Sequence, residues 1–182
     1  PAARQPAVDH AGRSGGVEVY CWNSVEFRPM RQLELRIPPP AVAALVAAMM
    51  WGISSVTPAL GLPGMTRMIV AIALAAIGFG IDVAGVISFW RARTTVNPMK
   101  PDASSSLVTG GIYKISRNPM DLGALCMLVA WAVYLSSVWA MIGPAAFVLY
   151  INRFQIAPEE RVLEEKFGAS FAAYRSAVPR WL

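Results

Sequence analysis

The chain has 182 residues, of which 55% are hydrophobic and 15% charged, and its formal net charge is +5. Its mean hydropathy of +0.47 is too high for an ordinary soluble domain, so the composition predicts an integral membrane protein. The positive charge does not point to nucleic acid, because the basic residues gather beside the ends of apolar runs, where they would face lipid headgroups.

The first 29 residues are rich in glycine, arginine and small polar residues, which predicts a disordered or non-native extension. Met30 is followed by a basic stretch and by three prolines at 38–40, so we expect native translation to begin at Met30. Residues 30–182 are then predicted to form a single membrane domain.

Two apolar runs come first in this domain. Residues 37–66 carry no charge, and residues 68–90 carry only Asp82. Since about 20 apolar residues cross the ~30 Å hydrocarbon layer as a helix, each run predicts one transmembrane helix. A carboxylate inside a span faces either a polar cavity or a structural partner, so Asp82 either lines a pocket or is held structurally.

A third apolar run, residues 122–152, would be ~46 Å long as one helix, which exceeds a single crossing. We therefore predict a helical hairpin with arms at 120–135 and 138–156 and a turn at Ser136-Ser137. Pro144 is expected to kink the second arm. The fold class is thus all-α, with about four transmembrane helices.

Charge distribution predicts the orientation of these helices. Basic residues precede the first span, lie between the second and third, and follow the fourth, whereas the two opposite connections contain only Arg67. The positive-inside rule then places both termini in the cytoplasm. Because the four-span form is short, we expect the protein to lie in the cytoplasmic membrane of a bacterium.

A cytoplasmic amphipathic segment is expected after the hairpin. The residues Ala157-Pro158-Glu159-Glu160 predict a helix start, since proline and acidic side chains suit a first turn. An apolar stripe follows, which packs on the protein or lies on the membrane, and Gly168 is expected to divide the segment into two helices. The stripe comprises Leu163, Phe167, Phe171, Tyr174 and Val178.

Polar residues fall into two clusters, 110–123 before the hairpin and 153–160 after it, and a hairpin brings both to one side. In the first cluster Arg117 is suited to hold a carboxylate or phosphate, and the Asn118 amide to bind polar ligand atoms. Neither the lone His10 nor the two cysteines, Cys21 and Cys126, show metal-ligand spacing, so no metal is expected.

These residues resemble the isoprenylcysteine carboxyl methyltransferases and the related phospholipid methyltransferases. The resemblance covers about residues 94–182 and rests on two patterns. The first pattern comprises Gly111, Tyr113, Arg117, Asn118, Pro119 and Gly123. The second comprises Glu159, Glu160, Phe167, Gly168, Tyr174 and Val178-Pro179-Arg180.

The resemblance implies an S-adenosylmethionine-dependent methyltransferase that acts on a lipophilic acceptor entering from the bilayer. It implies a cofactor pocket formed by the residues Tyr113, Asn118, Gly123, Glu159 and Glu160. Arg117 or Arg153 would orient the acceptor, and Glu159 or Glu160 would act as the base if the acceptor is an amine, which must first lose a proton.

One residue departs from the family pattern: Asp121 stands where most relatives carry tyrosine. It either binds the cationic part of the cofactor or marks a weakened site. Several alternatives stay open at this point. Within the methyltransferases these are a phospholipid amine or a small thiol as acceptor. From other classes they are a sterol-reductase-like NADPH enzyme and a non-enzymatic membrane scaffold.

Overall fold

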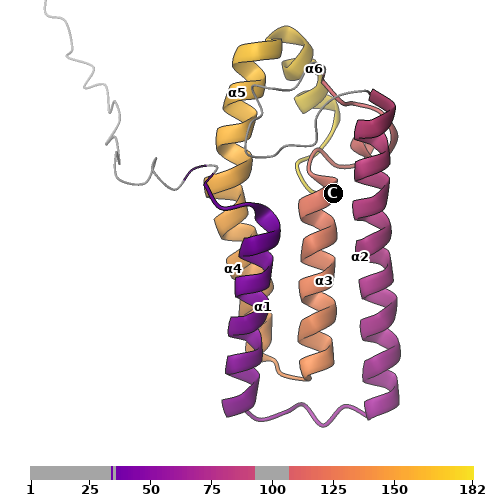
Figure 1. Ribbon diagram of the computed structural model, residues 1–182, viewed down its shortest axis with the longest axis vertical. Helices are drawn as coiled ribbons and strands as arrows, with labels where there is room; N and C mark the ends of the chain where they lie inside the picture. The colour runs from indigo at the N-terminus through magenta and orange to yellow at the C-terminus, as the bar shows by residue number, and fades with distance from the viewer. Residues whose placement is uncertain (1–33, 35, 93–106) are drawn as a thin grey trace, which may run out of the picture.

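The computed structural model describes residue 34 and residues 36–92 and 107–182, and this part of the chain is helical without strands (Figure 1). The expected extension at 1–29, the start at Met30 and the beginning of the catalytic part near 94 lie outside the described residues. The elements are α1 (Pro39–Val56), α2 (Gly64–Ala92), η3 (Gly111–Lys114), α3 (Pro119–Leu135), η4 (Trp139–Met141), α4 (Ile142–Ile151), η5 (Asn152–Ile156), α5 (Ala157–Phe167) and α6 (Ala169–Ala177).

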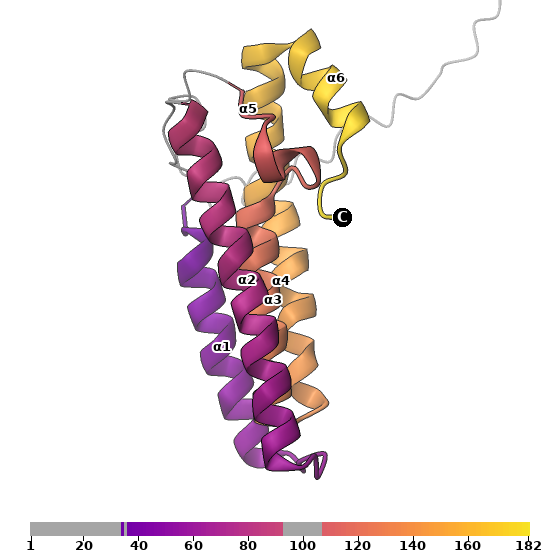
Figure 2. The same cartoon turned by 90° about the vertical axis from the view of Figure 1, so that its right-hand side faces the viewer.

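Four helices, α1 to α4, run side by side, and α5 and α6 extend beyond them at one end (Figures 1 and 2). Two of them, α1 and α2, are long and apolar enough to cross a bilayer, and α3 is a shorter apolar helix. The all-α prediction is confirmed for the described residues, and the first two predicted spans coincide with α1 and α2.

Small residues allow α2 and α3 to pack closely. The buried residues Ala71, Gly78 and Gly85 recur every seven positions and so lie on one face of α2. A methyl group added to Gly78 would lie 2.7 Å from the carbonyl oxygen of Gly123 on α3, which leaves no room for a side chain. The backbones of the two helices are therefore in direct contact beside Gly123.

The predicted hairpin turn is confirmed. Ser136 ends α3 in the left-handed conformation, with φ of 53°, and its carbonyl oxygen accepts a hydrogen bond of 2.7 Å from the N–H of Leu60 in the α1–α2 connection. Behind the turn, the side chains of Met50, Phe147 and Ile151 are completely buried and join α1 to α4. Pro144 lies in the first turn of α4, directly after the tight turn of η4.

The helix α5 begins at Ala157 as predicted, but this is not a free helix start, because the chain before it is already helical. The chain stays helical from α4 into α5 through η5, a π-helical turn in which the N–H of Ala157 bonds to the carbonyl oxygen of Asn152. Proline inside a helix lacks an N–H and its ring clashes with the preceding turn. The wider π turn lies directly before the buried Pro158, so the helix can continue past it.

The predicted division at Gly168 is confirmed, since this residue separates α5 from α6 with φ of 49°. The C-terminal part of the apolar stripe packs on the protein, because Phe171 is 2% exposed and Val178 is 8% exposed. The helices α5 and α6 therefore form a cap over the end of the bundle at which α3 begins (Figure 2).

Candidate functional site

The two polar clusters meet at the end of the bundle that α5 and α6 cover. The segment before α3 is joined to the chain end by three hydrogen bonds: Arg117 N–H to Pro179 O at 3.0 Å, Asn118 Nδ2 to Arg180 O at 3.1 Å and Ser116 Oγ to Arg180 O at 3.3 Å. Arg117 of the first cluster also lies 2.8 Å from Glu160 of the second, so the hairpin brings these parts of the two clusters to one side as expected.

Gly111 positions this segment against α2. Its φ of 61° lies in the left-handed region, which disfavours residues with a side chain. A methyl group at this position would also lie 2.5 Å from Ser88 Oγ on α2. Glycine therefore allows η3 to pack directly on α2 and places the next residue but one, Tyr113, in the interior, where it is 7% exposed.

Two arginines, Arg117 and Arg180, share the carboxylate of Glu160, and we call these three residues the basic pole. The Glu160 carboxylate lies 2.8 Å from Arg117 Nη1, and it accepts hydrogen bonds from Arg180 Nη2 at 2.6 Å and from Arg180 Nε at 3.2 Å. Two guanidinium groups thus share one carboxylate. Burial lowers the pKa of Arg117, an effect that Glu160 opposes. The buried Nε of Arg117 has no hydrogen-bond partner among the described residues.

The carboxyl groups of Asp82, Asp121 and Glu159 lie beside the basic pole, and we call them the acidic pole. Burial, together with the nearby carboxylates of Asp121 and Glu160, raises the pKa of Glu159 to about 8. Burial also raises the pKa of Tyr113 well above its usual value, and the charges of Glu159, Asp121 and Asp82 act in the same direction. Tyr113 therefore has three carboxyl groups in its surroundings.

The acidic pole has no basic partner in the described part of the chain: no ion pair there involves Asp82, Asp121 or Glu159. Asp121 is 8% exposed, and the buried Oδ1 of Asp82 has no hydrogen-bond partner among these residues. That Asp82 oxygen lies against Gly123, so closely that any side chain there would collide with it. Glycine at 123 thus makes room for the Asp82 carboxylate.

Tyr174 of α6 closes the site from the C-terminal side. Its hydroxyl donates a hydrogen bond of 2.7 Å to the carbonyl oxygen of Tyr113. Burial raises the pKa of this hydroxyl to about 12, although the positive charge of Arg117 opposes the rise. Since the donated proton is retained at all physiological pH values, the contact fixes α6 over η3.

A comparison with protein families matches residues 66–170 to the phospholipid methyltransferase model, which is more than half of the chain. The chain belongs to the phospholipid methyltransferase family. An uncharacterized protein of Haemophilus influenzae is 46% identical over 63 residues, which cover all of that protein and 35% of this chain. No solved structure matches the chain.

The family resemblance predicts a set of site residues, and most of them lie together in the structure. The structure gathers Tyr113, Arg117, Asp121, Gly123, Glu159 and Glu160 at one end of the bundle. Asn118 lies there too, but its amide nitrogen already binds the carbonyl oxygen of Arg180.

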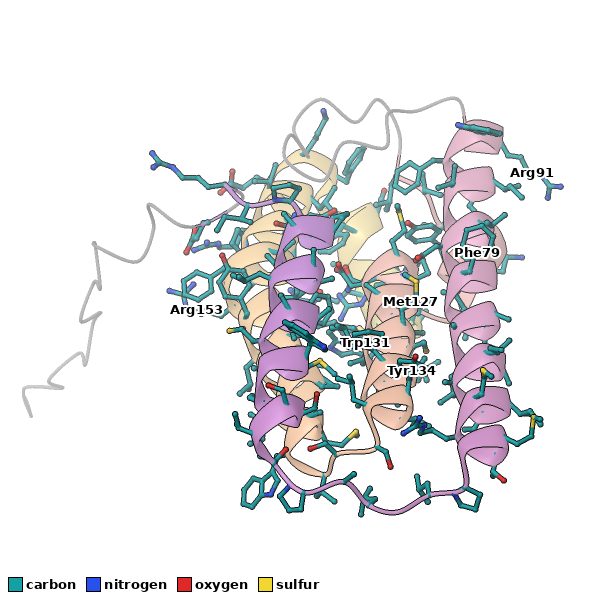
Figure 3. The ribbon with its side chains drawn as sticks, turned by 60° about the horizontal axis from the view of Figure 1, so that its bottom comes forward. Phe79, Arg91, Met127, Trp131, Tyr134 and Arg153 are labelled. Carbon is teal, nitrogen blue, oxygen red and sulfur yellow. The ribbon has the colours of Figure 1, made fainter. Side chains whose placement is uncertain are left out.

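Arg153 is not part of this group. Its Nη1 pairs with Glu34 Oε1 at 3.0 Å, and Arg161 of α5 pairs with the other oxygen of Glu34 at 2.6 Å. The Arg153 side chain is 47% exposed and points away from the bundle (Figure 3). These contacts join Glu34, which precedes α1, to the α4–α5 helix.

Two features of the site do not follow from the sequence. Arg180 belongs to the C-terminal pattern, but the pattern does not indicate that it contacts both Glu160 and the segment before α3. The sequence allows two interpretations of Asp82, and the structure places it in the acidic pole. In chemical terms, the paired poles can hold a molecule that carries a cationic and an anionic group close together. No group of three or more His, Cys, Asp or Glu side chains in the described ranges could hold a metal ion.

Proposed function

We propose that this family member is an S-adenosylmethionine-dependent methyltransferase that acts on a lipophilic acceptor at the cytoplasmic membrane face. The observation that supports this most is the juxtaposition of unpaired carboxyl groups with a guanidinium pair that shares one carboxylate. The methionine part of this cofactor is itself bipolar, with a carboxylate beside a cationic amine and a sulfonium. The site therefore has charges of the right sign for both of its ends.

The charges of the site residues match those of the cofactor. Glu159 and Asp121 would hold its cationic groups, which would replace the missing basic partner of the acidic pole. Arg117 would hold its carboxylate through the Nε that lacks a partner among the described residues. Glu160 then serves to position Arg117. When bound, the cofactor supplies an electrophilic methyl group, and the surrounding residues orient the acceptor in line with it and exclude water.

A lipid amine is the acceptor class that the charges favour. A carboxylate acceptor, as in isoprenylcysteine, would add a further acid to the three carboxyl groups of Asp82, Asp121 and Glu159, whereas an amine would supply the basic partner that they lack. An amine must lose its proton before it attacks. Since Glu159 would be occupied by the cofactor, Asp82 on the α2 side of the same pole, whose buried Oδ1 has no hydrogen-bond partner among the described residues, would take that proton.

The four-span topology is part of this proposal. With α1, α2, α3 and the η4–α4 arm all crossing the bilayer, the basic residues of α5, α6 and η3 gather at one end, and Arg67 lies at the other. The positive-inside rule then makes the site end cytoplasmic. The helices α5 and α6 cap the site from that side.

Binding and turnover tests separate this proposal from its rivals. The purified full chain in detergent should bind S-adenosylmethionine in a calorimeter and transfer its labelled methyl group to phosphatidylethanolamine in mixed micelles. A prenylated cysteine methyl acceptor and a small alkyl thiol serve as competing substrates. Binding of NADPH alone would favour a reductase, and binding of neither cofactor would favour a scaffold; either result refutes the proposal.

A further inference from the structure

A single basic side chain stands at the end of the bundle opposite the proposed site. Arg67, in the first turn of α2, is the one charged residue between Ile37 and Ile81. No ion pair joins it to an acidic side chain in the described ranges. Its guanidinium lies over the ring of Tyr134, 5.6 Å from the ring centre, so it is directed towards α3.

Tyr134 continues into an aromatic and apolar surface. Its ring stacks on Trp131 with the centroids 5.4 Å apart and an angle of 17° between the planes. The Trp131 Nε1 donates a hydrogen bond of 3.1 Å to the carbonyl oxygen of Ala47 on α1. Figure 3 shows Trp131 and Tyr134 along α3, on the side seen between α1 and α2.

The surface ends in an open pocket between α1 and α3. The pocket has a volume of about 380 Å³ and is lined by Ala47, Ala48, Trp51 and Trp131. It is shallow and opens to the outside of the bundle rather than being enclosed. Every lining residue is apolar or aromatic, so the pocket suits a hydrocarbon chain. A cation, two stacked rings and an apolar pocket thus follow one another from α2 to α1.

Arg67 is separate from the proposed methyl-transfer site. The 15 residues from Arg67 to Asp82 on the continuous helix α2 correspond to about 22 Å at ~1.5 Å per residue. If the acidic pole lies near one membrane surface, Arg67 lies towards the headgroups of the opposite leaflet. The guanidinium is half-buried and without an ion-pair partner among the described residues, so it is available to an anion, and phosphates are the anions of the lipid headgroups.

We propose that Arg67 and Tyr134 bind the phosphate of an anionic phospholipid of this opposite leaflet, with one acyl chain lying in the pocket beside Trp131. The choice of occupant rests on charge complementarity at Arg67 together with the apolar lining of the adjoining pocket. A planar guanidinium donates two parallel hydrogen bonds to a phosphate, which an ammonium group cannot do. The bound lipid would link α1, α2 and α3 at the end where loops join them.

Lipid retention measures this binding directly. The purified full chain is titrated with phosphatidylglycerol in nonionic detergent, and bound lipid is counted by native mass spectrometry. Arg67→Gln should weaken binding at least tenfold, Arg67→Lys less, and Tyr134→Leu several-fold. Arg91→Gln is the matched control, because it removes an exposed arginine from the other end of the same helix and should leave binding unchanged.

The outcomes separate specific binding from general attraction of charge. Equal binding by the parent and Arg67→Gln, or equal losses in Arg67→Gln and Arg91→Gln, would overturn the proposal. Inorganic phosphate should not displace the lipid at millimolar concentration, since it lacks the acyl chain; full displacement would also overturn it. Gel filtration confirms that each variant is folded, and Arg67→Lys and Tyr134→Leu keep the test decisive if Arg67→Gln does not fold.

Discussion

Replacing Glu159 by glutamine should stabilise the empty protein at high pH and weaken its binding of cofactor. The folded-state pKa of Glu159, about 8, lies above the ordinary value of 4.5. The folded protein therefore holds a proton that the unfolded chain loses between these values, so stability falls as the pH rises from 4.5 to 8. At 1.36 kcal/mol per unit of pKa, the total fall is at most about 5 kcal/mol.

Glutamine has no proton to lose, so the variant should lack this fall in stability. The assay is thermal unfolding of the full chain in detergent from pH 5 to pH 9, with and without S-adenosylmethionine. Without cofactor, Glu159→Gln should be the more stable protein at pH 9 and about equal to the parent at pH 5. With cofactor, it should lose about 1 to 3 kcal/mol of binding free energy, as expected for a lost charged partner in a buried site.

Glu160→Gln is the matched control, because it changes the adjacent residue in the same chemical way. It breaks the contacts of Glu160 with Arg117 and Arg180 and leaves two guanidinium groups facing each other. It should therefore destabilise the empty protein throughout the pH range. If Glu159→Gln also destabilises the empty protein at pH 9, or if it keeps the pH dependence of the parent, the reasoning about the acidic pole is refuted.

Three further predictions concern packing, charge and topology. Gly123→Ala should destabilise the protein by about 1–3 kcal/mol in thermal unfolding, because its methyl group collides with the Asp82 carboxylate of α2. The control Gly110→Ala, whose methyl group meets no atom within 4 Å, should lower the stability far less. Asp121→Asn should weaken S-adenosylmethionine binding in calorimetry by about tenfold, and unchanged affinity would remove this residue from the pocket. In a background without the native cysteines, Ile115→Cys should react with an impermeant thiol reagent only in inverted vesicles and Leu62→Cys only in right-side-out ones; labelling of both from one side would contradict the four-span topology.

Much of the fold could be predicted because it follows from apolar run lengths and local turn chemistry. The absence of charge sets the first two spans. The hairpin turn at Ser136-Ser137 follows from a run too long for one crossing, and Gly168 interrupts the C-terminal helix as expected. In each case one local property decides the structure, so neighbouring segments add little information.

The features that could not be predicted depend instead on contacts between distant parts of the chain. Proline and two acids at 158–160 are typical of a helix start, but here a π turn lets an existing helix pass the proline, and that accommodation depends on packing rather than on sequence pattern. Arg153 lies near the predicted site in the sequence, yet its side chain points away from the site because it forms an ion pair with Glu34, which is far away along the chain. Asp82 joins the acidic pole only because two glycines bring α2 against α3.

The helix continues without a break from α4 through η5 to α5. This arm therefore forms one rod that runs from the hairpin turn to the carboxyl group of Glu159. From Ile142 to Glu159 it measures about 26 Å at ~1.5 Å per residue, so a tilt of about 10° would move its far end by roughly 4 to 5 Å. Membrane helices tilt to match the thickness of the surrounding lipid. The distance between Glu159 on this rod and Asp121 on α3 would change with that tilt, so bilayer thickness would alter the spacing of the two carboxyl groups that we propose to hold the cofactor.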